Sequence, residues 1–302
     1  KGADWLVEGA SSIARKFGVA PIVIGLTIVS FGTSLPELLV NLFAAFRGST
    51  DIAIGNIVGS NIANILLILG ASASIRALKV KKNTVWKEIP FALLAMILVW
   101  IMGNDVLLAG GVTDALDRVD GLVLIAFFVI FLYYIFGIGK VEGEAEAPTK
   151  HTTRLSIFYI AAGIALLVIG GKLAVDAAQT LAVLAGLSER IIGLTVLAVG
   201  TSLPELVTSV VATLKGEDDI AIGNVVGSNI FNVFWILGFT STIIALPFSF
   251  GSGRDTLVAI VASLLLFFAL FVGKRHTLER WQGPVFLGGY ALYIIALVGG
   301  WF

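Results

Sequence analysis

The sequence predicts an all-α polytopic membrane protein, and three observations point to this class: the composition, an internal duplication and the placement of basic residues. Of the 302 residues, 58% are hydrophobic and only 13% are charged, and the mean hydropathy is +1.00. A soluble protein of this size would have about 25% charged residues. Several apolar stretches reach the roughly 20 residues that cross a bilayer as a helix.

The composition also limits the classes of function. The formal net charge is zero, so bulk electrostatics offer no argument for binding nucleic acid. There is no cysteine, and therefore no disulfide or thiolate metal site. The chain has no His-Glu-x-x-His motif, no phosphate-binding loop and no dinucleotide-binding fingerprint. We therefore expect a protein that lies in a lipid bilayer, is not an enzyme, and has no cofactor and no obligate protein partner.

The chain contains a duplication with an offset of 168 residues. The repeated segments are, in pairs, Gly-Thr-Ser-Leu-Pro-Glu at 32–37 and 200–205, Asp-Ile-Ala-Ile-Gly-Asn at 51–56 and 219–224, and Gly-Ser-Asn-Ile at 59–62 and 227–230. The same offset places Gly2 on Gly170, which follows an apolar run at 155–169. We therefore expect an equivalent run upstream of Lys1 and a complete unit of five helices. An odd number of helices forces two copies into opposite orientations, as in many secondary transporters.

Apolar runs and one polar linker divide the chain. After a short apolar-rich segment at 3–18, the runs lie at 20–46, 52–75, 89–109, 120–139, 155–185, 190–214, 220–247, 256–273 and 284–302. Residues 140–154, which include three glutamates and a proline, form the low-hydropathy linker. We predict a first five-helix repeat at 1–139 and a second, inverted repeat at 155–302. This makes ten transmembrane helices, with the first incomplete and the second and seventh broken at the duplicated motif.

Basic residues test this topology, because they collect in the cytoplasmic loops of membrane proteins. An alternating ten-helix arrangement puts most of them on one side: Arg15, Lys16, Arg76, Lys79, Lys81, Lys82, Lys87, Lys140, Lys150, Arg154, Lys215, Lys274, Arg275 and Arg280. The opposite side receives only Arg47, Arg118, Arg190 and Arg254, while Lys1 and Lys172 lie near helix ends. The bias predicts that the linker and the loop at 79–87 are cytoplasmic.

The duplicated motif places a carboxylate and a helix-breaking proline inside an apolar run. Proline has no N–H and its ring crowds the carbonyl four residues earlier, so Pro36 frees the carbonyl of Gly32. Acids inside the membrane are costly and mostly functional, which favours a functional role for Glu37 and Glu205 over a structural one. Free carbonyls, hydroxyls and carboxylates together form the hard oxygen cluster that a cation such as Ca2+ needs.

Hydroxyl and amide side chains near these acids are further candidate ligands. The motifs contribute Thr33, Ser34, Thr201 and Ser202. The next helix of each half contributes Ser60 and Asn64, or Ser228 and Asn232, and the spacing of four places each pair on one helical face. The structural alternatives are hydroxyls bonded to a carbonyl one turn back, and close helix packing at a small-xxx-small glycine pattern. We predict a ligand role for these side chains and a structural role for Asn61 and Asn229, which point elsewhere.

Other polar residues receive no role in transport. Lys172 and Asp176 are four residues apart and are predicted to pair near an interface. His151 and His276 fall in predicted loops, where we expect them to be solvated.

The two Gly-Thr-Ser-Leu-Pro-Glu motifs, each followed by a Gly-Asn-x-x-Gly-Ser-Asn-x-x-Asn helix, resemble the α-repeats of the sodium/calcium exchanger family within the calcium/cation antiporter superfamily. The resemblance is most specific at 24–70 and 192–238. It implies central ion sites where the broken second and seventh helices meet the third and eighth. By matching position, Glu37 and Glu205 would be acidic Ca2+ ligands and Thr33 would give a backbone oxygen. The same holds for Thr201, and the four serines would line counter-ion sites.

Asn232 departs from part of this family, because some relatives carry aspartate there, and this weakens any role for K+. A pair of central glutamates needs Ca2+ or a replacement before the site can cross the membrane. Protons would restore neutrality, since burial and mutual repulsion favour the protonated form of a carboxylate. Na+ ions bound by the same oxygens would serve equally, so the residues leave both counter-ions open. A passive cation channel that uses the acids as a selectivity ring is the alternative function, although broken helices in inverted repeats favour alternating access.

Overall fold

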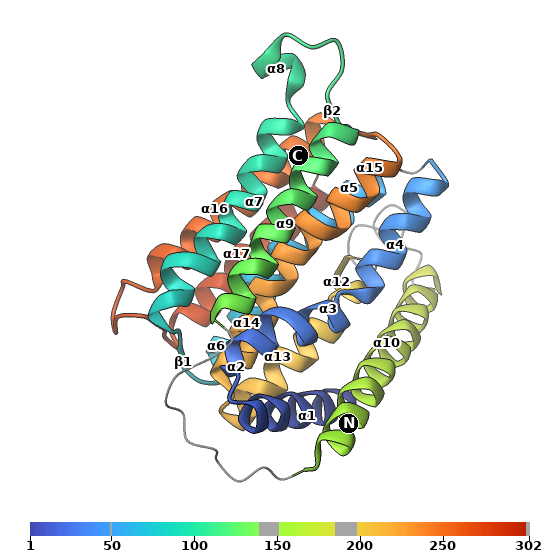
Figure 1. The fold of residues 1–302 in the computed structure, drawn as a ribbon. Coiled ribbons are helices and arrows are strands. Elements are labelled where there is room, and N and C mark those ends of the chain that lie inside the picture. Colours follow the sequence, from blue (N-terminus) through green and yellow to red (C-terminus); the bar gives the residue numbers. More distant parts are fainter. Residues whose placement is uncertain (49, 139–150, 185–197, 300–302) are drawn as a thin grey trace.

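The computed structural model describes the chain apart from residues 49, 139–150, 185–197 and 300–302, and it is almost entirely helical (Figure 1). Among the described residues, six helices are long and apolar enough to cross a membrane, or seven if one bent pair counts as a single span. The predicted all-α membrane fold is confirmed at this level. Most of the predicted linker and the start of the apolar run at 190–214 lie outside the described residues.

The first half begins with one helix and continues with a broken one. Its elements are, in order, α1 (Gly2–Phe17), α2 (Pro21–Ile24), the π-helical turn η1 (Gly25–Val29), α3 (Ser30–Thr33), α4 (Leu35–Phe46), α5 (Thr50–Ile62), π-helical η2 (Ala63–Leu69), α6 (Gly70–Ile75), π-helical η3 (Thr84–Glu88), α7 (Ile89–Met102), the short α8 (Asp105–Ala109) and α9 (Arg118–Ile138). The segments from α5 to α6 run on as one span, and η3 continues directly into α7.

The second half repeats this order of elements. It contains α10 (Thr153–Leu184), α12 (Ala198–Thr201), α13 (Leu203–Lys215), α14 (Asp218–Ile230), π-helical η5 (Phe231–Leu237), α15 (Gly238–Ile243), α16 (Phe250–Ala269) and α17 (Gln282–Val298). The π-helical segments η2 and η5 occupy equivalent places in the duplication. Short π-helical insertions are frequent at functional sites, because they shift the side chains that follow them around the helix.

Two short antiparallel ribbons join the halves at opposite ends of the molecule. Strand β1 (Leu78–Lys79) pairs with β4 (Thr277–Leu278), and β2 (Ala115–Leu116) pairs with β3 (Leu246–Pro247). The offset of the duplication makes β1 equivalent to β3. Nevertheless β1 lies at the lower end in Figure 1, whereas β2, the partner of β3, lies at the upper end. These equivalent segments of the two halves therefore lie at opposite ends.

The span from α14 to α15 and the span from α5 to α6 form the centre of the bundle. The most apolar window is 94% buried in the first and 78% buried in the second. By contrast, the corresponding windows of α9 and α10 are only 28% and 17% buried. The outer helices thus expose large apolar side chains such as Tyr133 and Phe136, which a bilayer would cover. The duplicated polar residues consequently lie in the most enclosed part of the fold.

Glycines allow α1 to pack closely along the first part of α10. A Cβ atom on Gly9 would lie 2.7 Å from the carbonyl oxygen of Ser156. A Cβ atom on Gly163 would lie 2.7 Å from the backbone nitrogen of Leu6. Both neighbours are backbone atoms that cannot rotate away, so the two helices need these small residues to approach as they do.

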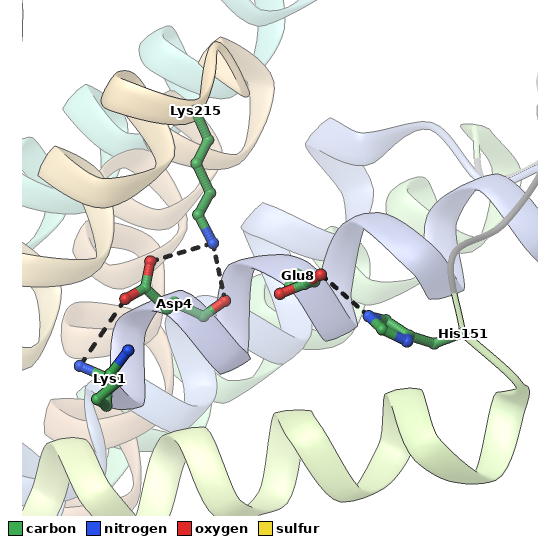
Figure 2. Close-up of polar contacts among 5 residues, drawn as sticks. All are labelled: Lys1, Asp4, Glu8, His151 and Lys215. Atoms are coloured by element: carbon green, nitrogen blue, oxygen red, sulfur yellow. Dashed lines mark hydrogen bonds and ion pairs between the residues drawn. The ribbon is translucent and has the colours of Figure 1, made fainter.

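Polar contacts, including an ion pair, then connect α1 with its surroundings (Figure 2). The Lys215 ammonium at the end of α13 lies 3.2 Å from Asp4 Oδ1 and donates to the Asp4 carbonyl at 3.1 Å. Farther along α1, His151 Nε2 lies 3.0 Å from Glu8 Oε1. These pairs are partly exposed, so each contributes little to folding stability on its own. They nevertheless tie α1 both to α13 and to the segment that leads into α10.

The prediction that His151 and His276 are solvated is wrong. Besides its contact with Glu8, His151 packs edge-on against Tyr159 with ring centroids 4.9 Å apart. His276 has a φ of 57° and a buried Nε2, and its carbonyl accepts from the N–H of Val80 at 2.9 Å. Neighbouring side chains or backbone cover part of each imidazole, which a hydropathy profile does not reveal. Lys172 and Asp176 do pair as predicted, at 2.7 Å.

Glycines of α14 also let the broken helix of the first half approach the centre. A Cβ atom on Gly223 would lie 2.9 Å from the carbonyl oxygen of Ile22 and 3.0 Å from Cα of Gly25. The structural interpretation of the glycine pattern is therefore confirmed in the second half. For Gly55 and Gly59, the equivalent glycines, no atom of a described residue lies within 4 Å of an added Cβ.

We expect Gly223→Ala to destabilise the protein, because the added methyl group meets backbone that must move. Overpacking of this kind costs about 1–3 kcal/mol, which lowers the unfolding temperature in detergent. Gly288→Ala on α17 is the matched control, since its Cβ meets no described atom within 4 Å. Equal unfolding temperatures for the two variants would contradict the close approach of α14 to η1.

Candidate functional site

Each motif places a helix break beside its glutamate. In the first half α3 ends at Thr33, Ser34 has φ −85° and ψ 10°, and α4 begins at Leu35 with Pro36 in its first turn. The two parts of this broken helix meet at 45°. The second half repeats the break, with Ser202 at φ −85° and ψ 6° before α13. Since the prolines lack an N–H, carbonyl oxygens of the preceding turn have no helical donor.

The two glutamates are buried and are joined through serines of the opposite half. Glu37 and Glu205 are each only 1% exposed. Ser34, in the first motif, donates to Oε1 of Glu205 at 2.8 Å. Ser202, in the second motif, donates to Oε1 of Glu37 at 3.3 Å. The two motifs therefore meet at the centre of the bundle, each completing the surroundings of the other's carboxylate.

A further serine from the following helix reaches each carboxylate. Ser60 donates to Oε1 of Glu37 at 3.5 Å, and Ser228 donates to Oε1 of Glu205 at 3.4 Å. One oxygen of each carboxylate is thus shared by two serines. The other oxygen, Oε2, is buried without any hydrogen-bond partner in both residues.

The motif threonines also bond across the two halves. Thr33 Oγ1 donates to Oδ1 of Asn224 at 3.0 Å, and Thr201 Oγ1 donates to Oδ1 of Asn56 at 3.2 Å. Asn224 in turn donates to the backbone carbonyl of Glu205 at 3.2 Å. Each motif threonine therefore links its own half to an asparagine of the other half.

Four buried amides meet where the two central spans cross. Nδ2 of Asn64, in η2, donates to Oδ1 of Asn229 at 2.9 Å. Nδ2 of Asn232, in η5, donates to Oδ1 of Asn61 at 2.9 Å. All four are at most 3% exposed. The carbonyl oxygens Oδ1 of Asn64 and Asn232 are buried and have no partner.

These contacts leave a set of unpaired acceptor oxygens that duplication relates in pairs. They are Oε2 of Glu37 and Glu205, and Oδ1 of Asn64 and Asn232. Nearly all buried polar atoms in proteins find a partner, so matched unpaired acceptor oxygens in both halves form an arrangement that a cation would satisfy. Oxygen ligands suit hard cations such as Ca2+ and Na+. Over the described ranges no three His, Cys, Asp or Glu come together, so two charges are combined with neutral oxygens.

An apolar pocket of about 320 Å3 lies beside this centre. Its walls come from α4, α10, α12 and the start of α13, and Pro36, Pro204 and Thr201 are among the lining residues. Lys172 and Asp176 also line it. The pocket therefore reaches the broken turns of both motifs from the face that α10 covers. A Cβ atom on Gly32 or on Gly200 would lie 2.4 Å or 2.2 Å from a side-chain atom of α10.

The structure brings together most of the predicted site residues. Both glutamates and all four serines are linked by direct hydrogen bonds, and Asn64 and Asn232 lie one turn beyond Ser60 and Ser228 on the same spans. The threonine hydroxyls also donate to asparagines of the opposite half. The sequence reasoning missed the exchange of serines between halves, and it missed the bonds from Asn61 and Asn229 to the candidate ligands. The duplication is the signal that could have suggested both. If the two repeats meet at one centre, a contact from the first repeat to the second implies an equivalent contact from the second repeat to the first.

The fold and this site define an integral membrane protein that handles cations. The family model described as sodium/calcium exchanger protein matches residues 1–137 and 155–299. The chain therefore belongs to the sodium/calcium exchanger family, and the resemblance noted in the sequence is confirmed.

Relatives and solved structures agree with this assignment. The chain is 40% identical to the putative antiporter CaxA of Alkalimonas amylolytica, over 96% of the chain and 92% of that protein. It is 32% identical to the sodium/calcium exchanger MaX1 of Methanosarcina acetivorans, over 98% and 94%. A structure of the sodium-calcium exchanger NCX_Mj, soaked with Na+ and Ca2+, matches with a TM-score of 0.83 and 35% identity, covering 98% of the chain and 93% of that structure.

Binding of Ca2+ should depend on the central glutamates and not on buried carboxylates in general. A ligand at about 100 times its Kd stabilises a protein by roughly 2.7 kcal/mol, so Ca2+ should raise the unfolding temperature of the wild type. We expect Glu37→Gln to remove this increase while the ion-free variant stays folded, because the buried charge that attracts the ion is gone.

Glu88→Gln is the matched control for this measurement. Glu88 is a buried carboxylate that accepts from Tyr134 and has an unpaired Oε2, but it lies outside the motif centre. It should keep the full Ca2+ effect. Loss of the effect in both variants, or in neither, would remove Glu37 from the site.

Proposed function

We propose that this protein exchanges Ca2+ for Na+ across the membrane by alternating access, using one central site. The observation that carries the proposal is the pair of buried glutamates whose unpaired oxygens lie among serines and amides from both halves. Glu37 and Glu205 are assigned to Ca2+. Oxygens of the other predicted residues are assigned to Ca2+ or to Na+: Thr33, Thr201, Ser34, Ser202, Ser60, Ser228, Asn64 and Asn232.

Charge balance explains why such a site couples two ions. One Ca2+ neutralises two carboxylates. Its departure leaves both charges in a medium of low dielectric, which costs several kcal/mol for each ion that is not compensated. The empty site is therefore a poor candidate for crossing the membrane, and the same site neutralised by other cations is a good one. Coupling follows from this difference in cost.

Two considerations favour Na+ over H+ as the replacement. A proton needs only one acceptor atom, and the carboxylates alone would satisfy two protons. The serine hydroxyls and the unpaired amide oxygens of Asn64 and Asn232 would then have no ligand. Na+ uses such neutral oxygens. In addition, the similar proteins MaX1 and NCX_Mj are named as sodium/calcium exchangers.

Alternating access is supported by the arrangement of the two halves. Equivalent strands lie at opposite ends of the molecule, as expected if repeats at 1–139 and 155–302 are inverted. We infer ten helices on this basis, with the linker at 140–154 in the cytoplasm because of the bias in basic residues. The least buried of the apolar windows belongs to α10, which makes α1 and α10 the elements best placed to move against the centre.

Transport in vesicles tests the proposal and its alternative. We expect Ca2+ loaded inside vesicles to leave when Na+ is supplied outside, and not to leave under a pH step in Na+-free medium. Movement driven by the pH step alone would replace Na+ by H+ as the counter-ion. Movement without any opposing cation would favour a passive channel, for which neither the site nor the comparisons offer support.

The same vesicles test the role of the acids in transport. Glu37→Gln and Glu205→Gln should each abolish Na+-driven Ca2+ movement, because a single remaining charge cannot balance Ca2+. Glu88→Gln should transport normally. Transport retained by either central variant, at wild-type protein levels in the vesicles, would exclude that glutamate from the mechanism.

A further inference from the structure

The four amides at the crossing of the central spans, Asn61, Asn64, Asn229 and Asn232, form an ordered set of hydrogen bonds. Asn61 lies at the end of α5 and Asn229 lies at the end of α14. Each forms hydrogen bonds to the backbone and to the candidate ligand of the opposite half. Their own side chains lie outside the carboxylate centre.

Two backbone carbonyls determine how the first pair of amides is oriented. Asn61 Nδ2 donates to the backbone carbonyl of Asn229 at 3.3 Å, and Asn229 Nδ2 donates to the backbone carbonyl of Asn61 at 3.5 Å. Met96, in α7, offers its sulfur to the same nitrogen of Asn61 at 3.2 Å. A backbone carbonyl can only accept. The nitrogen of each side-chain amide must therefore face it, and the oxygen must face the other way.

This orientation passes to the second pair of amides. The outward oxygens of Asn61 and Asn229 can only accept, so Asn232 and Asn64 must present their nitrogens to them, at 2.9 Å in both cases. Once the nitrogen is engaged, the remaining atom of each amide is its oxygen. These oxygens are buried and unpaired, one turn from the serines that bond the glutamates.

We propose that Asn61 and Asn229 are positioning residues that turn the amide oxygens of Asn232 and Asn64 towards the transported cation. The inference rests on the proposed function, since it concerns the same site. We call this chain of hydrogen bonds, from the two backbone carbonyls through Asn61 and Asn229 to Asn232 and Asn64, the amide relay. Without the relay, the amide of Asn64 or Asn232 could rotate and present its N–H2 group, which repels a cation. Each half orients an amide of the other half, so replacing Asn61 or Asn229 is expected to change the orientation of an amide in the other repeat.

Replacing Asn229 tests the relay. Asn229→Ala removes the acceptor of Asn64 Nδ2, and the freed amide is expected to rotate. Loss of one oriented ligand and a buried donor left unpaired should weaken Na+ binding about tenfold. The measurement is the Na+ concentration that gives half of the maximal increase in unfolding temperature, followed by the same titration with Ca2+. Gln282→Ala is the control, because this buried amide bonds the carbonyl of Ala269 at 2.8 Å and touches no site residue.

A second background separates positioning from packing. A carboxylate at position 64 has no N–H2 group to orient, and the oxygen of Asn229 would repel it. In Asn64→Asp protein, the Asn229→Ala change should therefore cost nothing or strengthen Na+ binding. If Asn229 only filled space, its removal would weaken Na+ binding by the same factor in the wild-type and the Asn64→Asp backgrounds. Equal losses of Na+ affinity therefore overturn the inference.

The two titrations distinguish a failure of the relay from a failure of the proposed Na+ exchange. If the wild type shows no Na+ effect on unfolding, the proposed exchange for Na+ is wrong, and the Ca2+ titrations then test the relay by themselves. If the wild type binds Na+ and Asn229→Ala binds both ions as well as wild type, the proposed exchange stands and the relay is wrong.

Discussion

The structure depends on one electrostatic constraint: two carboxylates, each bonded to a serine of the other's motif, are buried in the most enclosed part of a helical bundle that belongs in a membrane. Each is 1% exposed, and burial of an unbalanced charge is among the largest penalties a fold can carry. In each carboxylate, Oε1 accepts hydrogen bonds from serine hydroxyls, and Oε2 has no hydrogen-bond partner. Under the proposed exchange, bound Ca2+ or Na+ would supply the positive charge that compensates these two carboxylates.

The duplication meets this constraint by exchange between the halves. Ser34 serves Glu205 and Ser202 serves Glu37, while each threonine bonds an asparagine of the other repeat. Neither half could build the site alone. Because the serines that bond each carboxylate come from both repeats, a movement of one helix group against the other would alter the surroundings of both carboxylates together. The proposed alternating access would require such a coupled change.

The symmetry is incomplete, and the differences are physical. Asn41 donates to the carbonyl of Ala53 and accepts from Thr240, whereas Ser209, its equivalent, donates to the carbonyl of Ala221 and accepts from Asn224. As a result Asn224 uses its amide nitrogen fully, while the nitrogen of Asn56 is buried without a partner. The second half is therefore held more tightly around its glutamate than the first among the described residues.

The sequence alone determined the helical membrane class, the duplication and the candidate site residues, because apolar length, proline chemistry and intramembrane acids are local properties that can be recognised without coordinates. Glu37, Glu205 and the serines were predicted on this basis, as was the family. Only the tertiary structure decided which serine reaches which glutamate, and that Asn61 and Asn229 orient the neighbouring amides. The physical reason is that hydrogen bonds between residues about 170 positions apart depend on how two helices cross and on π-helical turns at η2 and η5. A spacing in the sequence cannot express either of these.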